Sequence, residues 1–101
     1  MEQVTGHVIP DFRPVLAHGL QAIIGSLDEK IAAETDGRKK DNFAAMRLTL
    51  QSTVELAGRY ADLAAEKQKH AAPERAAQLG LMERTLRKVP EHGCDTLYEA
   101  I

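Results

Sequence analysis

The feature that most constrains the fold is the spacing of apolar residues between positions 41 and 70. Apolar residues recur there every three or four positions, which is the period of an α-helix and not that of a strand. The main stripe consists of Phe43, Met46, Leu50, Val54, Ala57, Ala61 and Ala64. Leu48, Leu56 and Leu63 widen the apolar face. The pattern predicts a helix that is capped by Asp41, runs to about His70, is on the order of 45 Å long and packs on two sides.

A first, shorter helix is predicted before it. Asp11 is placed to accept hydrogen bonds from the free N–H groups of a first turn, and Pro14 is tolerated in that turn. The stripe of this helix is Leu16, Leu20, Ile23, Ile24, Leu27 and Ile31. Gly19 and Gly25 lie within it, and each weakens a helix by roughly 1 kcal/mol relative to Ala. We therefore expect a neighbouring helix to pass closely at these glycines, and a turn at 34–37 to follow.

A third helix and the beginning of a fourth complete the pattern. Pro73 suits the first position of a helix, and Pro90 ends it. The stripe between them is Leu79, Met82, Leu86 and Val89. Thr96 and Glu99 then form a capping-box pattern that opens a helix, of which barely one turn follows. Because one turn is not stable alone, we interpret the chain as a fragment of a longer protein.

The predicted fold is therefore all-α, with three helices (one of them long) and the first turn of a fourth, packed antiparallel and without a sheet. Residues 1–10 contain Gly6 and Pro10 and are predicted to be extended, whereas residues 11–101 form the helical segment. Only 4% of the residues are aromatic and none is Trp, so the core must be aliphatic and rich in Ala. Such a core buries little area, and we expect marginal stability in isolation.

Charge and composition exclude several classes of function. The net charge is −2, and the longest basic run is only 38–40, so no concentrated basic face for nucleic acid is predicted. No apolar run approaches the ~18 residues of a membrane span. The single cysteine, Cys94, excludes an internal disulfide and is typical of a reducing compartment. We expect a cytoplasmic protein that binds neither nucleic acid nor membrane.

Few residues are candidates for chemistry. His92 and Cys94 could supply two metal ligands, but a structural zinc site needs four. The other histidines, His7, His18 and His70, stand in three separate segments, so no metal site is predicted. Cys94 is interpreted as a loop cysteine that packs like a small apolar residue. A role of His7 as catalytic base would need a nucleophile or an acid beside it, and the sequence offers none.

Arg59 and Tyr60 are the remaining candidate site. A guanidinium group next to an aromatic ring could recognise an anion. An ion pair of Arg59 with Glu55 or Asp62, at helical spacings of four and three, is the favoured interpretation. The sequence therefore predicts no catalytic, cofactor-binding or metal-binding residue.

Several motifs resemble those of the pyruvate formate-lyase-like glycyl radical enzymes. The segment 6–12, Gly-His-Val-Ile-Pro-Asp-Phe, is similar to the family's GHxxPDY start of its first long helix, with Phe12 in place of the commoner Tyr. The segments 42–46 and 59–64 resemble the family's F-x-A-M and RYAxLA helix. The segment from Pro73 through Leu79, Val89-Pro90 and 96–101 follow in the family's order, and Gly93-Cys94 stands where small residues or Pro are usual.

The resemblance implies a large anaerobic enzyme built on a β/α barrel of two half-barrels. Its glycyl radical, installed by a radical S-adenosylmethionine activase, takes a hydrogen from a cysteine inside the barrel. Members act as formate acetyltransferases, diol or choline lyases, decarboxylases and fumarate-adding synthases. The aligned segment precedes the radical glycine, the thiyl cysteine and the substrate-binding residues, so this chain alone is expected to be inactive.

We therefore expect a structural fragment whose helices brace the outside of the barrel. Its partners are then the remainder of the parent enzyme, with self-association through exposed apolar faces when the chain is alone. The rival interpretation is a free-standing helical adaptor that dimerises through those faces. A third, a helical ligand sensor, would require a pocket with converging polar groups.

Overall fold

The computed structural model describes Gly6 and residues 9–101, so most of the predicted extended segment 1–10 lies outside the described residues. The described residues form four helices, which are α1 (Arg13–Ala33), α2 (Gly37–Gln68), α3 (Pro73–Lys88) and α4 (Leu97–Ala100). No strand occurs in this part of the chain. The predicted all-α fold, with one long helix and the first turn of a fourth, is confirmed.

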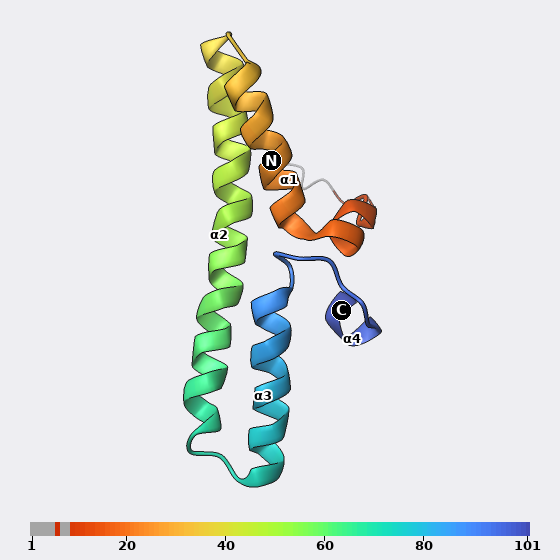
Figure 1. Ribbon diagram of the computed structural model, residues 1–101, viewed down its shortest axis with the longest axis vertical. Helices are drawn as coiled ribbons and strands as arrows, with labels where there is room; N and C mark the ends of the chain where they lie inside the picture. Colours follow the sequence, from red (N-terminus) through yellow and green to blue (C-terminus); the bar gives the residue numbers. More distant parts are fainter. Residues whose placement is uncertain (1–5, 7–8) are drawn as a thin grey trace.

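The long helix α2 organises the molecule. Its 32 residues correspond to about 48 Å at 1.5 Å per residue, close to the 55 Å length of the whole molecule. Both α1 and α3 pack against α2 and run antiparallel to it (Figure 1). The helix α1 lies along the first half of α2, and α3 lies along the second half (Figure 1). The fold is thus two helical hairpins that share one helix.

The start of α2 differs from the predicted one. Its N-cap is Asp36, whose carboxylate accepts hydrogen bonds from the backbone N–H groups of Arg38 at 2.9 Å and Lys39 at 3.3 Å. The prediction of Asp41 as the cap was wrong. Asp36 lies in the turn and satisfies the free amides five residues earlier than predicted, so the basic residues 38–40 belong to the helix.

The start of α1 agrees with the prediction. Asp11 Oδ1 accepts a hydrogen bond from the backbone N–H of Arg13 at 3.2 Å, and its carboxylate also binds the Arg13 guanidinium. The Arg13 hydrogen bonds hold the pKa of Asp11 below its usual value. Pro14 lies in the first turn, where its missing N–H costs little.

The core is small and lies where α1 and α3 meet α2. Its buried hydrophobic residues are Leu20, Ile24, Leu27, Ala57, Ala61, Ala64 and Leu79. All of them belong to the predicted stripes. Of the residues that widen the apolar face of α2, Leu48 and Leu56 are 66% and 53% exposed, and Leu63, which faces the segment that carries α4, is 47% exposed. Within the described residues the side of α2 around Leu48 and Leu56 is therefore uncovered, and the prediction that this side is also packed is wrong for this chain.

The helix α1 is broken at Gly19. Gly19 has φ 75° and ψ 174°, which is not helical and which L-residues with a side chain rarely adopt. A Cβ added there would lie 2.3 Å from the backbone oxygen of Glu91, whereas one added at Gly25 would meet nothing within 4 Å. The expectation that a helix passes closely at both glycines was wrong. The loop 89–94 passes at Gly19, and Gly25 faces open space.

Candidate functional site

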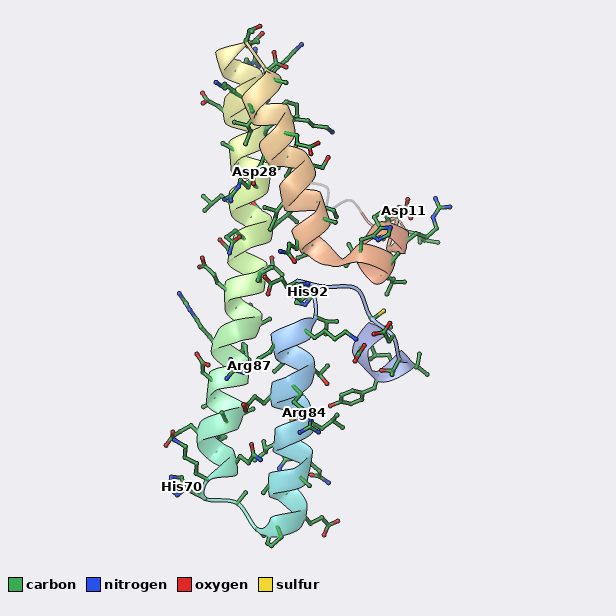
Figure 2. All side chains as sticks on the ribbon, in the orientation of Figure 1. Asp11, Asp28, His70, Arg84, Arg87 and His92 are labelled. Carbon is green, nitrogen blue, oxygen red and sulfur yellow. The ribbon has the colours of Figure 1, made fainter. Side chains whose placement is uncertain are left out.

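The loop 89–94 enters the break in α1 and replaces the missing helical hydrogen bonds. The backbone N–H of Leu20 donates to the oxygen of Pro90 at 2.8 Å, and that of Gln21 donates to the oxygen of Glu91 at 2.9 Å. Amides at the start of a helical segment have no partner within it, so the loop acts as their cap. Figure 2 shows His92 of this loop close to the bend of α1.

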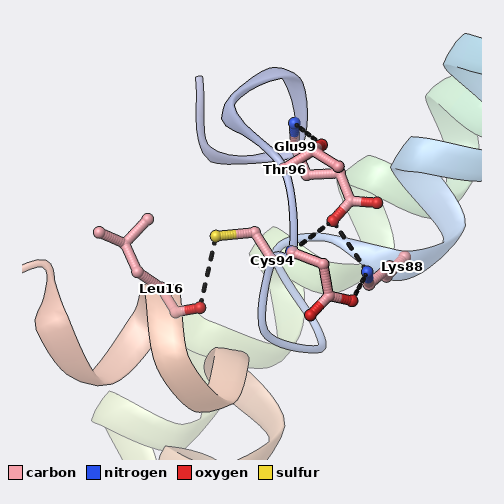
Figure 3. Close-up of polar contacts among 6 residues, drawn as sticks. Leu16, Lys88, Cys94, Thr96 and Glu99 are labelled. Carbon is pink, nitrogen blue, oxygen red and sulfur yellow. Dashed lines mark hydrogen bonds and ion pairs between the residues drawn. The ribbon is translucent and has the colours of Figure 1, made fainter.

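The same contact also satisfies the first part of α1. The backbone N–H of Cys94 donates to the oxygen of Leu16 at 3.0 Å, and Cys94 Sγ lies 3.4 Å from that oxygen (Figure 3). A Cβ added at Gly93 would lie 2.4 Å from the oxygen of Ala17. Two backbones therefore touch directly, each with a glycine at the closest point. We call this arrangement the Gly19–Gly93 contact.

A network of charged and polar groups holds α4 next to the end of α3. Lys88 Nζ donates to Asp95 Oδ2 at 2.6 Å and to Glu99 Oε2 at 2.8 Å (Figure 3). Glu99 Oε2 also accepts from the backbone N–H of Asp95 at 2.7 Å, and Thr96 Oγ1 accepts from the N–H of Glu99 at 3.2 Å. The predicted cap at Thr96 is confirmed, but Glu99 binds the amide one residue before the cap.

These contacts shift two pKa values in opposite directions. The backbone N–H of Asp95 and, after it, the Lys88 ammonium hold the pKa of Glu99 below its usual value. Hydrogen bonds to Asp95 and then to Glu99 raise the pKa of Lys88. Each shift favours the charged form, because each group gains partners of opposite polarity. The network therefore keeps both groups charged over a wide pH range.

An open groove of about 670 Å³ lies between α4, α2, α3 and the first part of α1. Its walls are mostly apolar and include Leu16, Tyr60, Leu63, Met82, Leu86 and Tyr98. We call it the α4 groove. A site for a small polar ligand would need several converging polar groups, and the carboxylate of Glu99 at this wall is already bound to Lys88. The groove is thus suited to apolar side chains. The sequence did not predict this groove. Its one sequence signal is that the groove residue Leu63 lies outside the main apolar stripe of α2.

The histidines and the cysteine do not gather into a metal site in the described part of the chain, where no group of three or more His, Cys, Asp or Glu side chains is found. His92 and Cys94 both line the α4 groove. His18 lies in α1, and His70 Nε2 lies 3.7 Å from Glu66 Oε1 (Figure 2). His7 lies outside the described residues.

Arg59 makes neither of its expected ion pairs. Within residues 9–101 no ion pair joins Arg59 to Glu55. The carboxylate of Asp62 binds Arg87 of α3 instead, at 3.1 Å (Arg87 is labelled in Figure 2). The prediction was wrong because the packing of α3 on α2 supplies a cation that the sequence spacing does not reveal. Tyr60, next to Arg59, lines the α4 groove.

No helix in the described part of the chain is both long enough and apolar enough to span a membrane.

Comparison with known proteins agrees with this architecture. The family model described as "Pyruvate formate lyase-like" matches residues 1–101. The chain belongs to the pyruvate formate lyase-like family. Among solved structures it is similar to the glycerol-bound form of the B12-independent glycerol dehydratase from Clostridium butyricum, with 26% sequence identity and a TM-score of 0.84. No curated protein matches the chain.

The extent of that structural match differs greatly between the two proteins. The matched region covers 94% of this chain but only 13% of the dehydratase chain. The family that the sequence motifs indicated is therefore confirmed. The chain corresponds to a small part of the dehydratase.

Proposed function

We propose that the chain is a non-catalytic helical segment from the N-terminal region of a glycyl radical enzyme, and that it supports the remainder of that enzyme. The observation that carries the proposal is the extent of the structural match, 94% of this chain against 13% of the dehydratase. The proposed parent is an anaerobic radical lyase or acyltransferase, such as a formate acetyltransferase or a glycerol- or choline-type lyase. It is proposed to act in the cytoplasm.

A structural role of this chain is supported by its thiol and carboxylate groups, which are bound to other parts of the fold. Cys94 Sγ lies against the Leu16 oxygen, in a loop that caps α1. Asp95 and Glu99 both bind Lys88, so their charges serve to position α4. Groups that are already satisfied by the fold are poorly placed to take part in proton transfer with a substrate.

The glycyl radical proposed for the parent is not assigned to Gly19 or Gly93. Gly19 and Gly93 are pressed against a second stretch of backbone, and the thiol of Cys94 contacts a carbonyl oxygen. We assign the radical glycine and its thiyl cysteine to the remainder of the parent enzyme, and propose that a separate S-adenosylmethionine-dependent activase installs the radical. What this chain contributes is a helical scaffold.

The test compares the purified 101-residue chain with the full polypeptide that the gene encodes. Each protein is mixed anaerobically with an activase, S-adenosylmethionine and a one-electron reductant. The substrates offered are pyruvate with coenzyme A as the acetyl acceptor, glycerol, or choline. We expect turnover and a radical signal in electron paramagnetic resonance from the full polypeptide only. Turnover by the 101-residue chain would contradict the proposal.

The second candidate is a free-standing helical adaptor, and the exposed apolar side of α2 favours it. Leu48 and Leu56 are 66% and 53% exposed, and such residues often mark a binding surface. Self-association of the isolated chain is expected under both proposals and does not separate them. A stop codon directly after Ile101 favours the adaptor, and an open frame of several hundred more codons favours the segment of a radical enzyme.

A further inference from the structure

We propose that the α4 groove receives an apolar segment of the same polypeptide from beyond Ile101. This inference rests on the proposed function, because it needs a longer chain. It goes beyond that function by naming which surface of the helical segment contacts the remainder of the enzyme. The proposed docking surface does not include the outer side of α2 around Leu48, which lies outside the α4 groove.

The groove exposes apolar side chains that water solvates poorly. Tyr60 is 56% exposed, Leu63 47% and Tyr98 51%, and they come from two helices that are distant in sequence. Burying such surface is favourable in proportion to its apolar area. Since polar groups are sparse along the walls, an occupant with unpaired polar groups would lose hydrogen bonds to water without replacement. The occupant is therefore apolar.

The position of α4 explains why the occupant belongs to the same chain. The bonds from Lys88 to Asp95 and Glu99 fix α4 at the groove, and Glu99 is only 17% exposed. Ile101, which follows α4, lines the groove and is 96% exposed. Residues that follow it in a longer chain would leave from the rim of the groove. A tethered segment binds at a high effective concentration, which favours it over a second molecule.

The extent of the structural match supports the same occupant. The fold of this chain recurs as 13% of the glycerol dehydratase chain, so a protein of this architecture contains a large amount of other polypeptide. A free ligand or a separate partner protein would have to compete with that polypeptide for the groove.

The test uses Cys94, which lines the groove, as a reporter. The rate of its alkylation by iodoacetamide is measured by peptide mass spectrometry in the 101-residue chain and in the full polypeptide. We expect the thiol to react about tenfold more slowly, or slower still, in the full polypeptide, because the docked segment must open first. Equal rates in the two proteins would overturn the inference.

Two substitutions in α2 provide the matched comparison. Leu63→Asp places a charge in the groove, whereas Leu48→Asp places one on the outer side of the same helix. In the full polypeptide we expect Leu63→Asp to remove the protection of Cys94 and Leu48→Asp to leave it unchanged. In the 101-residue chain both variants should react like the unsubstituted chain. An equal effect of both substitutions in the full polypeptide would contradict the groove as the docking surface.

The remaining outcomes separate the rival occupants. Protection of Cys94 in the 101-residue chain that increases with protein concentration would indicate a second copy in the groove and overturn the inference. A stop codon after Ile101 would remove both the proposed function and this inference. A long polypeptide in which Cys94 reacts freely would remove only this inference.

Discussion

Two regions of the molecule are held together in different ways, the packing of α2 on α3 and the contact of loop 89–94 with α1. Along its second half, α2 packs on α3 through small side chains, and Ala57, Ala61 and Ala64 are buried there. The loop 89–94, which follows the C-terminal end of α3, joins α1 mainly through backbone hydrogen bonds at the Gly19–Gly93 contact. The first region depends on the size of side chains, and the second depends on their absence.

This difference teaches that the Gly19–Gly93 contact tolerates substitution less well than the packing of α2 on α3. Helix packing with small side chains adjusts to a substitution by a shift of one helix. A backbone-to-backbone contact leaves no side chain that can move, and its hydrogen bonds fail together when the two segments separate. We therefore expect substitutions at the Gly19–Gly93 contact to have larger effects than those between α2 and α3.

The largest effect is expected from Gly19→Ala. The substituted residue would have to keep φ near 75°, and its Cβ would lie 2.3 Å from the Glu91 oxygen. Strained backbone alone costs about 1–3 kcal/mol, and the clash adds to it, so we expect a loss of about 3 kcal/mol or more. Chemical denaturation followed by circular dichroism measures it.

Gly25→Ala is the matched control, in the same helix. A Cβ at Gly25 meets nothing within 4 Å, so this substitution should increase the stability by up to about 1 kcal/mol. Equal effects of the two substitutions would show that the Gly19–Gly93 contact is not especially sensitive to an added side chain.

A smaller effect is expected from Ala61→Leu between α2 and α3. Ala61 is 0% exposed, so three additional carbon atoms must displace a neighbouring helix. Overpacking of this kind costs about 1–3 kcal/mol. The free energy of unfolding is measured against Ala44→Leu, at an exposed position of the same helix, which should stay within about 0.5 kcal/mol of the original chain. A cost above that of Gly19→Ala would reverse the proposed order of the two regions.

The next smaller effect is local and concerns α4. Lys88→Met removes both ion pairs of the network but leaves the hydrogen bond from the Asp95 N–H to Glu99. We expect α4 to detach more often, with little change in the global unfolding transition, because α4 is one turn long. Nuclear magnetic resonance of the Ala100 and Ile101 amides detects the detachment. Lys39→Met, at an exposed position of α2, should leave those signals in place.

The smallest effect is a pH dependence of the same contact. The pKa of Glu99 is lower in the folded chain than its usual 4.5, so its contribution is present above pH 4.5 and is lost as the pH falls further, through the lowered pKa. The pKa of Lys88 is raised above 10.5, so its contribution is present below that pH and is lost as the pH rises through the raised pKa. The Ala100 amide signal should therefore stay constant between the two limits. A change centred near neutral pH would contradict this assignment.

The helices themselves could largely be predicted from the sequence, because their signals are local. Apolar periods of three and four placed α1, α2 and α3, Pro73 marked the start of α3, and the Thr96 cap marked α4. The error at Asp41 is also local, since two possible capping residues stand five positions apart and the earlier one, Asp36, forms the cap. The motifs that indicated the family depended on order along the chain and did not need the fold.

The α4 groove and the Gly19–Gly93 contact could not be predicted in this way. A glycine in a helical stripe can mark a close neighbour, as Gly19 does, or nothing, as Gly25 does, and no residue nearby distinguishes the two. The predicted ion pair of Asp62 with Arg59 was likewise wrong, because the packing of α3 brings Arg87 to Asp62. Such pairs depend on how separate helices are placed in space.

The sequence by itself determined that this chain forms helices, where they begin and end to within a few residues, and which side of each is apolar. These properties follow from hydrogen bonds and side-chain spacing within a few residues of each other. Only the tertiary structure decided that α1 breaks at Gly19 and that loop 89–94 fills the break. It also decided that, among the residues the structure describes, nothing covers α2 around Leu48 and Leu56. These features arise from contacts between segments that are more than 70 positions apart in the case of Leu16 and Cys94, and no local pattern encodes them.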